Sequence, residues 1–347
     1  MERSDITLSD AKIGKRVHRQ GNSVSYVLNE ISGLRSPPGS QFSRYDIARD
    51  DTGRLARRLQ HTEPATFGLL HCKGFTLSGT KGDPKITLLL NIPPDLAPNP
   101  RSLRDLLLNT GPPESLSQRF QVAQGLAKSI SYVHTFGFVH KNVRPESILC
   151  FSGAHETITA TYLIGFELFR RDMGWTQRLG DTSLDKDLYR HISRQGIDPK
   201  WNYIMQHDIY SLGVCLLEIG LWKSFIDYAI HGTSTTTTLQ PADILDFPAN
   251  LNESQAAHHL ATEGAAKLVS LARNDLPRYM GTKYSEIVIT CLTCLHGSND
   301  DFGDDLESED AQGVPVGVRF VEKVLLRLNT LAPAAAVFCY RLQPFST

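Results

Sequence analysis

The sequence predicts an α+β protein made of a small β-rich part, residues 1–96, and a larger helical part, residues 97–347. Segments rich in β-branched and aromatic residues are concentrated before residue 96. Amphipathic helical patterns dominate after residue 97. Between them stand Pro93 and Pro94, which we expect to form a hinge because proline interrupts regular structure.

In the small part, the sequence predicts strands over residues 24–31, 67–75 and 86–90. A short helix is expected over residues 54–60, where Leu55 and Leu59 lie four residues apart on one face. The glycines near the start of the chain, such as Gly14 and Gly21, are isolated. A loop that wraps phosphates needs several glycines so that backbone amides can approach them, and we find no such loop here.

In the large part, we expect helices over residues 102–107, 116–136, 208–220, 267–273, 284–295 and 318–328. Ser102 has the side chain of a capping residue for the first of these, and Gly137 that of a C-cap for the second. The Ser/Thr run at 233–238 and the acidic stretch at 299–310 are typical of exposed loops. The tail from Pro333 shows no interpretable pattern.

Composition narrows the class of function. The chain has 347 residues, 41% hydrophobic content and a net charge of −1, so neither a nucleic-acid footprint nor a membrane surface is indicated. Its charged N-terminus has no signal-peptide pattern and no segment is apolar enough to span a bilayer, so we expect a cytoplasmic protein. Its six cysteines are interpreted as reduced core thiols, in preference to disulfides or a zinc site at Cys291 and Cys294.

Residues 140–149 read HKNVRPESIL. This run resembles the catalytic loop of protein kinases, whose usual form is HRDLKPENIL. The departures fall on the reacting groups. Asn142 stands where kinases have the aspartate that accepts the substrate hydroxyl proton, and Ser147 where they have the asparagine that holds a magnesium ion. Arg144 stands where they have a lysine near the transferred phosphate, and His140 is retained.

Residues 161–167, TYLIGFE, have the apolar pattern of a buried strand followed by a turn. They resemble the strand that leads into the kinase D-F-G. With Phe166 aligned, Gly165 takes the position of the metal-binding aspartate and Glu167 that of the glycine. Magnesium prefers carboxylate and phosphate oxygens, and the matched positions 142, 147 and 165 carry no carboxylate. Glu167 remains an alternative ligand if the backbone departs from the kinase form.

Residues 206–220 read QHDIYSLGVCLLEIG. Apolar residues at three- and four-residue spacing predict a helix buried on most sides, and Asp208 can accept bonds from free amides at its start. The run also resembles the kinase helix D-[IV]-[YW]-S-[LF]-G-V-x-L-x-E. In that family the aspartate braces the catalytic loop and does no chemistry. The resemblance therefore implies a structural Asp208 that bonds the backbone around His140 and Lys141.

Longer runs at 200–222, 276–284 and 288–292 are similar to kinase-like domains of filamentous fungi, often found behind a HeLo-type prion-inhibition and propagation domain. The resemblance spans about residues 15–330. It implies a bilobal kinase-like fold and a role in self/non-self signalling. The small part departs from the family: it has no G-x-G-x-x-G, no V-A-I-K strand and no glutamate in the helix at 54–60. Lys12 and Lys15 either substitute for the missing lysine or are solvated surface residues.

The residues favour a pseudokinase, an interaction module that meets other signalling proteins without transferring phosphate. A positioned general base contributes ~10²–10⁴-fold and bound metal usually more, and Asn142 and Gly165 supply neither. The alternatives are a divergent active kinase that transfers the ATP γ-phosphate to Ser/Thr, and another ATP-using transferase. We expect no cofactor; if ATP binds, it does so without magnesium and with Arg144 as the cation. In the other reading, Arg144 pairs with Glu146 or Glu167.

Overall fold

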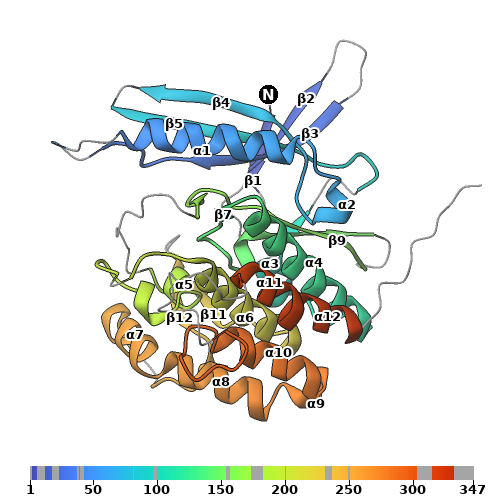
Figure 1. Ribbon diagram of the computed structural model, residues 1–347, viewed down its shortest axis with the longest axis vertical. Coiled ribbons are helices and arrows are strands. Elements are labelled where there is room, and N and C mark those ends of the chain that lie inside the picture. Colours follow the sequence, from blue (N-terminus) through green and yellow to red (C-terminus); the bar gives the residue numbers. More distant parts are fainter. Residues whose placement is uncertain are drawn as a thin grey trace, which may run out of the picture.

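The computed structural model describes residues 2–5, 12–17, 23–36, 39, 43–80, 82–96, 100–113, 115–153, 157–172, 183–199, 201–230, 237–248, 251–302 and 315–331. Over these ranges the protein is a mixed α and β structure. A sheet crossed by one long helix lies at one end of the molecule, and a group of helices forms the rest (Figure 1). No helix within these ranges is long and apolar enough to cross a membrane.

The sheet of the small part has five strands among the described residues, in the order β1-β2-β3-β5-β4, and every neighbouring pair is antiparallel. The strands are β1 (Glu2–Asp5), β2 (Lys12–Val17), β3 (Ser23–Ile31), β4 (Cys72–Thr80) and β5 (Asp83–Asn91). The predicted strands at 24–31 and 86–90 are confirmed as β3 and β5. Because side chains alternate along β3, Val27 and Asn29 lie on its core side while Glu30 is exposed.

The helix of the small part is longer than predicted. α1 (Arg44–Leu59) begins ahead of residue 54 because the Ser43 side chain caps it, accepting a bond from the Asp46 amide. Its first half is mostly polar, so it carries no apolar stripe that the sequence pattern could reveal. Its second half buries Leu55 and Leu59.

The strand predicted over residues 67–75 is wrong in its first half. Pro64 opens a short helix, α2 (Pro64–Phe67), and Gly68 ends it with a φ of 65°. β4 starts only at Cys72, so the chain turns where the sequence suggested extension. The ring of Phe67 packs on Tyr132 of the large part, with ring centroids 4.2 Å apart.

The larger part is mainly helical. Its α-helices are α3 (Leu103–Asn109), α4 (Leu116–Thr135), α5 (Leu184–Asp187), α6 (Met205–Leu221), α7 (Glu253–His259), α8 (Ala265–Asn274), α9 (Pro277–Met280), α10 (Thr282–Leu292), α11 (Val316–Phe320) and α12 (Leu326–Leu331). The six predicted helices are confirmed in type as α3, α4, α6, α8, α10 and the run from α11 to α12, with shifted ends. Ser102 caps α3 as predicted, accepting from the Asp105 amide.

α6 is the central element of this part, with every residue from Gln206 to Leu221 buried. It lies against α4 and α10. Gly213 makes the α10 contact possible, because a Cβ there would stand 2.8 Å from the Cβ of Cys291. Asp208 lies in the first turn of α6, and its carboxylate reaches a neighbouring loop instead of its own helix amides. The expectation that it caps its own helix was therefore wrong.

Short strands frame the large part. They are β6 (Arg101–Ser102), β7 (Phe138–Val139), β8 (Ile148–Ser152), β9 (Ile158–Leu163), β10 (Arg170–Arg171), β11 (Ile226–Ile230) and β12 (Thr237–Pro241). The loop predicted at 233–238 lies outside the described residues except for Thr237 and Thr238, which are in β12, so that prediction was wrong for these two. Residues 303–310 of the acidic stretch and the tail from Pro333, with Cys339, also lie outside. The other five cysteines are free and buried, as predicted.

Candidate functional site

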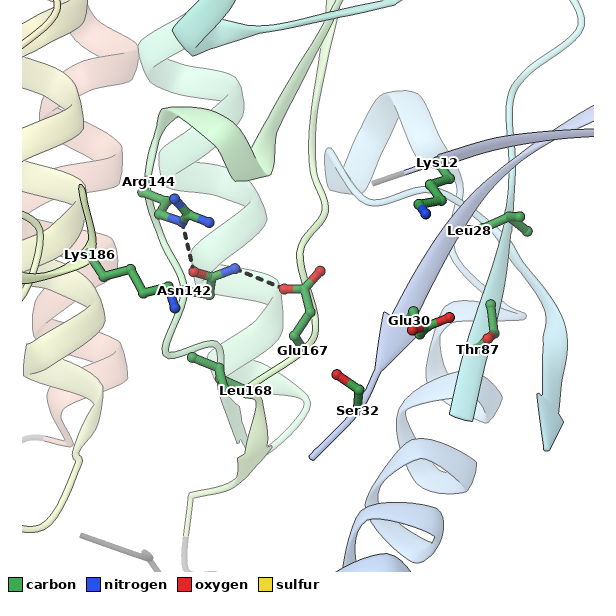
Figure 2. Close-up of a pocket in the computed structure, with 10 residues that line it drawn as sticks. All are labelled: Lys12, Leu28, Glu30, Ser32, Thr87, Asn142, Arg144, Glu167, Leu168 and Lys186. Carbon is green, nitrogen blue, oxygen red and sulfur yellow. Dashed lines mark hydrogen bonds between the residues drawn. The ribbon is translucent and has the colours of Figure 1, made fainter. Parts of the chain in front are cut away.

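Three separate stretches of chain meet in the cleft between the sheet and the helices. The loop of residues 140–149 connects β7 to β8 and includes the single-turn helix η1 (Pro145–Ser147). The turn Gly165–Glu167 follows β9, and Asn29 reaches in from β3. In Figure 2 the side chains of Asn142, Arg144 and Glu167 lie across from those of β2, β3 and β5. The structure therefore brings the sequence-predicted residues of both motifs together.

Asp208 holds the backbone of this loop. Its carboxylate, fully buried, accepts from the amides of His140 at 2.8 Å and Lys141 at 2.9 Å. Tyr203 donates its hydroxyl at 2.7 Å and His134 Nε2 lies at 3.0 Å. Burial by itself would raise the pKa of Asp208, but the bond and charge of His134, helped by His140, lower it to about 2. The ionised carboxylate is thus the fixed point of the loop, through the contacts expected from the resemblance.

Lys141 shows that this bracing is needed. Its φ of 66° lies in the left-handed region, which a non-glycine residue adopts only when its surroundings impose it. The bond from its amide to Asp208 supplies that constraint. Burial and the charges of three nearby arginines, Arg170, Arg194 and Arg190, lower the pKa of its side chain to about 7.

His140 is a neutral structural residue. Burial lowers its pKa to about 4, so the imidazole is uncharged near neutral pH. Its Nε2 lies 3.0 Å from the carbonyl of Ile164, and its Nδ1 accepts from the Asn142 amide at 3.3 Å. The ring also packs edge-on against Phe166, with centroids 4.8 Å apart. Through these contacts His140 joins the loop to the turn at Gly165.

Asn142 is bonded on both ends of its amide. Nδ2 donates to Glu167 Oε2 at 2.8 Å and to the Gly165 carbonyl at 3.3 Å. Oδ1 accepts from Nε of Arg144 at 3.0 Å. A carboxamide is not basic, and here its oxygen already holds a guanidinium proton. Asn142 can orient its neighbours in this geometry but cannot remove a proton from a substrate.

Glu167 bridges the two parts of the protein. Asn142 donates to one of its oxygens, and Asn29 of β3 donates to the other at 2.9 Å. The Asn29 oxygen accepts from the amides of Gly165 at 2.8 Å and Phe166 at 2.7 Å. One fully buried side chain of the sheet thus satisfies the whole turn.

Gly165 occupies a position that no other residue would fit. Its φ is +87°, a conformation that L side chains rarely adopt. A Cβ there would lie 2.7 Å from the Cβ of Ser147 and 3.2 Å from Nδ2 of Asn142. The place aligned with the metal-binding aspartate of kinases is therefore closed by backbone geometry as well as by residue type.

Ser147 and Arg144 are engaged within the loop. The Ser147 hydroxyl donates to the Arg144 carbonyl at 2.8 Å and accepts from the Arg144 amide at 3.1 Å, which closes the turn of η1. The Arg144 guanidinium bonds Asp185 at 2.8 Å and lies 3.6 Å from Glu146. Of the two readings of Arg144, the geometry matches pairing with local carboxylates, and its exposed fraction is 4%.

A cavity of about 290 Å³ remains beside these groups. Its lining residues are Lys12, Leu28, Glu30, Ser32, Thr87, Asn142, Arg144, Glu167, Leu168 and Lys186. This volume is at the lower end of ligand pockets, which span about 300–1,000 Å³. Lys12 is exposed at the cavity wall, and the side chain of Lys15 lies outside the described residues. Among described residues, no group of three or more potential metal ligands gathers here or elsewhere.

A second polar contact joins the small part to the large part. Arg171 of β10 donates through Nε to Asp51 of α1 at 2.6 Å, and its other nitrogen lies 3.4 Å from Asp50. Asp51 is buried, and Arg171 is partly exposed. Sequence reasoning missed Asn29, Asp51 and Asp185. The one available signal was the polar Asn29 in an apolar strand.

No protein-family model matches the chain, and no curated protein matches it.

Proposed function

We propose that this chain is a bilobal protein-kinase-like domain that does not transfer phosphate. On this reading residues 1–96 form the small lobe, residues 97–347 the helical lobe, and the domain acts by binding other signalling proteins. The proposal extends to a relationship with the fungal kinase-like domains of the HeLo-associated group. Its basis there is the resemblance of the sequence runs.

The observation that carries the proposal is the bonding of the cleft. The residues aligned with the general base and both metal ligands are Asn142, Ser147 and Gly165, and each is used to hold the protein itself. The carboxylate nearest to them, Glu167, is bonded by Asn29 and Asn142. Phosphoryl transfer depends on positioned charge around the transferred group, and these residues leave only positioning.

The arrangement of elements supports the fold within this proposal. A sheet with one helix, a proline-containing connection and a helical part with the loop of residues 140–149 at their junction occur in the order that the resemblance implies. Asp208 supports the loop through the backbone contacts expected of its kinase counterpart. The scaffold is retained and the reacting groups are replaced, which favours binding over catalysis.

Phosphoryl transfer tests the proposal directly. The full chain is incubated with radiolabelled ATP, magnesium or manganese, and generic protein substrates, and autophosphorylation is followed in parallel. We expect no incorporation above the level of a heat-denatured sample. Transfer that persists in the native protein and disappears in Asn142→Ala would establish the divergent-kinase alternative. Transfer lost in Glu167→Gln would assign the metal to Glu167.

Nucleotide binding is tested separately by calorimetry with millimolar ATP, in EDTA and in magnesium. Because Arg144 is paired with Asp185 and the cavity is small, we expect no heat of binding in either buffer. Binding in EDTA that vanishes in Arg144→Ala would show that the guanidinium takes the place of the metal. Such binding would keep the domain non-catalytic but make it nucleotide-responsive.

A further inference from the structure

A second cavity, of about 860 Å³, lies beside the connection between the two parts of the chain. Its wall is formed by residues 62–65, which join α1 to α2, by residues 91–96, and by His71 and Tyr162. We call it the hinge cavity. It shares no lining residue with the cavity around Asn142, so a ligand there would not compete for the same atoms.

The hinge cavity has polar atoms that the described residues do not satisfy. Asn91 Nδ2 lies 3.2 Å from Nδ1 of His71, which leaves its Oδ1 buried without a hydrogen-bond partner. Tyr162 has an exposed fraction of 4%, and no hydrogen bond of its hydroxyl is found in the described part of the chain. Buried polar groups are almost always bonded, so each unsatisfied one calls for an explanation. A ligand with N–H donors would satisfy the Asn91 oxygen.

The charge of the wall is acidic. Glu63 and Asp95 line the cavity, and no lysine or arginine is among its described lining residues. Burial, reinforced by the charges of Asp95 and Glu63, raises the pKa of Tyr162 to about 12. The phenol is therefore neutral at physiological pH and is close enough to both carboxylates to sense them. A cation placed among these three groups gains from both charges at once.

The connection itself adds acceptors and apolar surface. Pro93 and Pro94 have no amide hydrogen, so this stretch presents carbonyls with few donors. Ile92, which lines the cavity, uses its amide to bond the Ser25 carbonyl, and Leu96 uses its amide to bond the Pro93 carbonyl. The wall thus accepts hydrogen bonds and covers an aliphatic stem, which matches a cation on a hydrocarbon chain.

We propose that the hinge cavity binds an arginine side chain of a partner protein, with Glu63, Asp95 and the Asn91 oxygen around the guanidinium and the prolines along its stem. Arginine fits better than lysine because its planar group has five donors and can reach several acceptors together. The inference deepens the proposed function, on which it rests only for taking the side chain from a protein. It names the chemistry of the partner at one surface.

The first experiment uses the full chain and two isosteric probes. Binding of n-butylguanidinium and of n-butylurea is measured by saturation-transfer NMR and calorimetry at low salt. We expect the guanidinium to bind with a millimolar Kd and the neutral urea at least about tenfold more weakly, because a tenfold ratio is a modest requirement for contact with two carboxylates. Equal binding of the two probes would overturn the proposal.

Variants locate the binding. Glu63→Gln and Asp95→Asn should each weaken n-butylguanidinium binding several-fold and together abolish it, while Tyr162→Phe should weaken it less. Asp198→Asn is the matched control, since Asp198 is an exposed carboxylate that does not line this cavity. Thermal melts identify any variant that fails to fold, and each substitution is tested separately so that one misfolded variant does not decide the result. Unchanged binding in the folded double variant would refute the site.

The source of the cation is decided by a third probe. N-acetyl-arginine-N-methylamide presents the side chain as a peptide does, and we expect it to bind at least as well as n-butylguanidinium. If agmatine binds and the capped arginine does not, the cavity takes a free amine and the protein-partner proposal is wrong. Phosphate transfer by the same preparation would refute the proposed function and leave these binding results intact.

Discussion

Replacing Asp208 by alanine is the most decisive test of how the cleft is held. The carboxylate receives four donors: the amides of His140 and Lys141, the hydroxyl of Tyr203 and Nε2 of His134. A buried donor left unbonded costs about 1–3 kcal/mol. Even at about 1 kcal/mol each, Asp208→Ala loses about 4 kcal/mol, a large share of the 5–15 kcal/mol that stabilises a typical protein.

The pKa of Asp208 gives a second measure of the same bonds. A value of about 2 instead of 3.8 corresponds to about 2–3 kcal/mol in favour of the ionised form. Because the folded-state pKa is depressed, this stability is present above pH 4 and is lost as the pH falls toward 2. It is smaller than the loss in Asp208→Ala because a protonated acid still fills the site and accepts some bonds.

The assay is urea denaturation followed by circular dichroism at pH 7, with a thermal melt beside it. We expect the melting temperature of Asp208→Ala to fall by roughly 8 °C, at roughly 2 °C per kcal/mol for a chain of this size. Asp208→Asn should also be destabilised, because an amide turned either way meets two donors with its own NH₂. The exposed Asp198→Asn is the control. A loss below about 1 kcal/mol in Asp208→Ala would refute the reasoning.

Three further predictions follow from the same site. Gly165→Ala should cost about 2–4 kcal/mol, from the left-handed backbone and the overpacking together, whereas Gly196→Ala, with a φ of +75° and open space around it, should cost only about 1 kcal/mol; equal urea midpoints would contradict this. A double-mutant cycle of Asn29→Ala and Glu167→Gln should show a coupling of about 1 kcal/mol, and additive losses would mean that their bond contributes nothing in solution. Burial lowers the pKa of three histidines well below 6.5, to about 4, 4 and 3: His140, His191 and His207. The unfolded chain therefore binds more protons than the folded one as the pH falls from 6.5 toward 4, and stability should drop by up to about 4 kcal/mol per pH unit; a urea midpoint unchanged between pH 7 and 5 would contradict it.

The features that could be predicted from the sequence are local. Ser102 before a helix and Gly137 after one are recognised from a few neighbouring residues, and the apolar spacing of α6 lies within one element. The first half of α1 escaped recognition because its residues are mostly polar. The turn at Gly68 was hidden because its apolar neighbours, Leu69 and Leu70, are buried in a connection and not in a strand.

The features that could not be predicted are pairings between distant residues. Asn29 meets Glu167 across 138 positions, and Asp51 meets Arg171 across 120. A single sequence records which residues are polar but not which of them meet after folding. The matched positions in the loop were therefore accessible to sequence comparison, whereas the side chains that now satisfy them became visible only in three dimensions.

The geometry at Gly165 also bears on how this chain can evolve. An aspartate regained at this position would collide with Ser147 and strain the backbone, so the variant would be penalised before it could bind any metal. Relieving the strain requires the turn to leave the left-handed region, and that breaks the two amide bonds to Asn29. Restoration thus needs coordinated changes at positions 29 and 165 and a shift around 147, with each single step unfavourable. The route back to the ancestral arrangement is closed to stepwise mutation, which leaves the cleft free to diverge further.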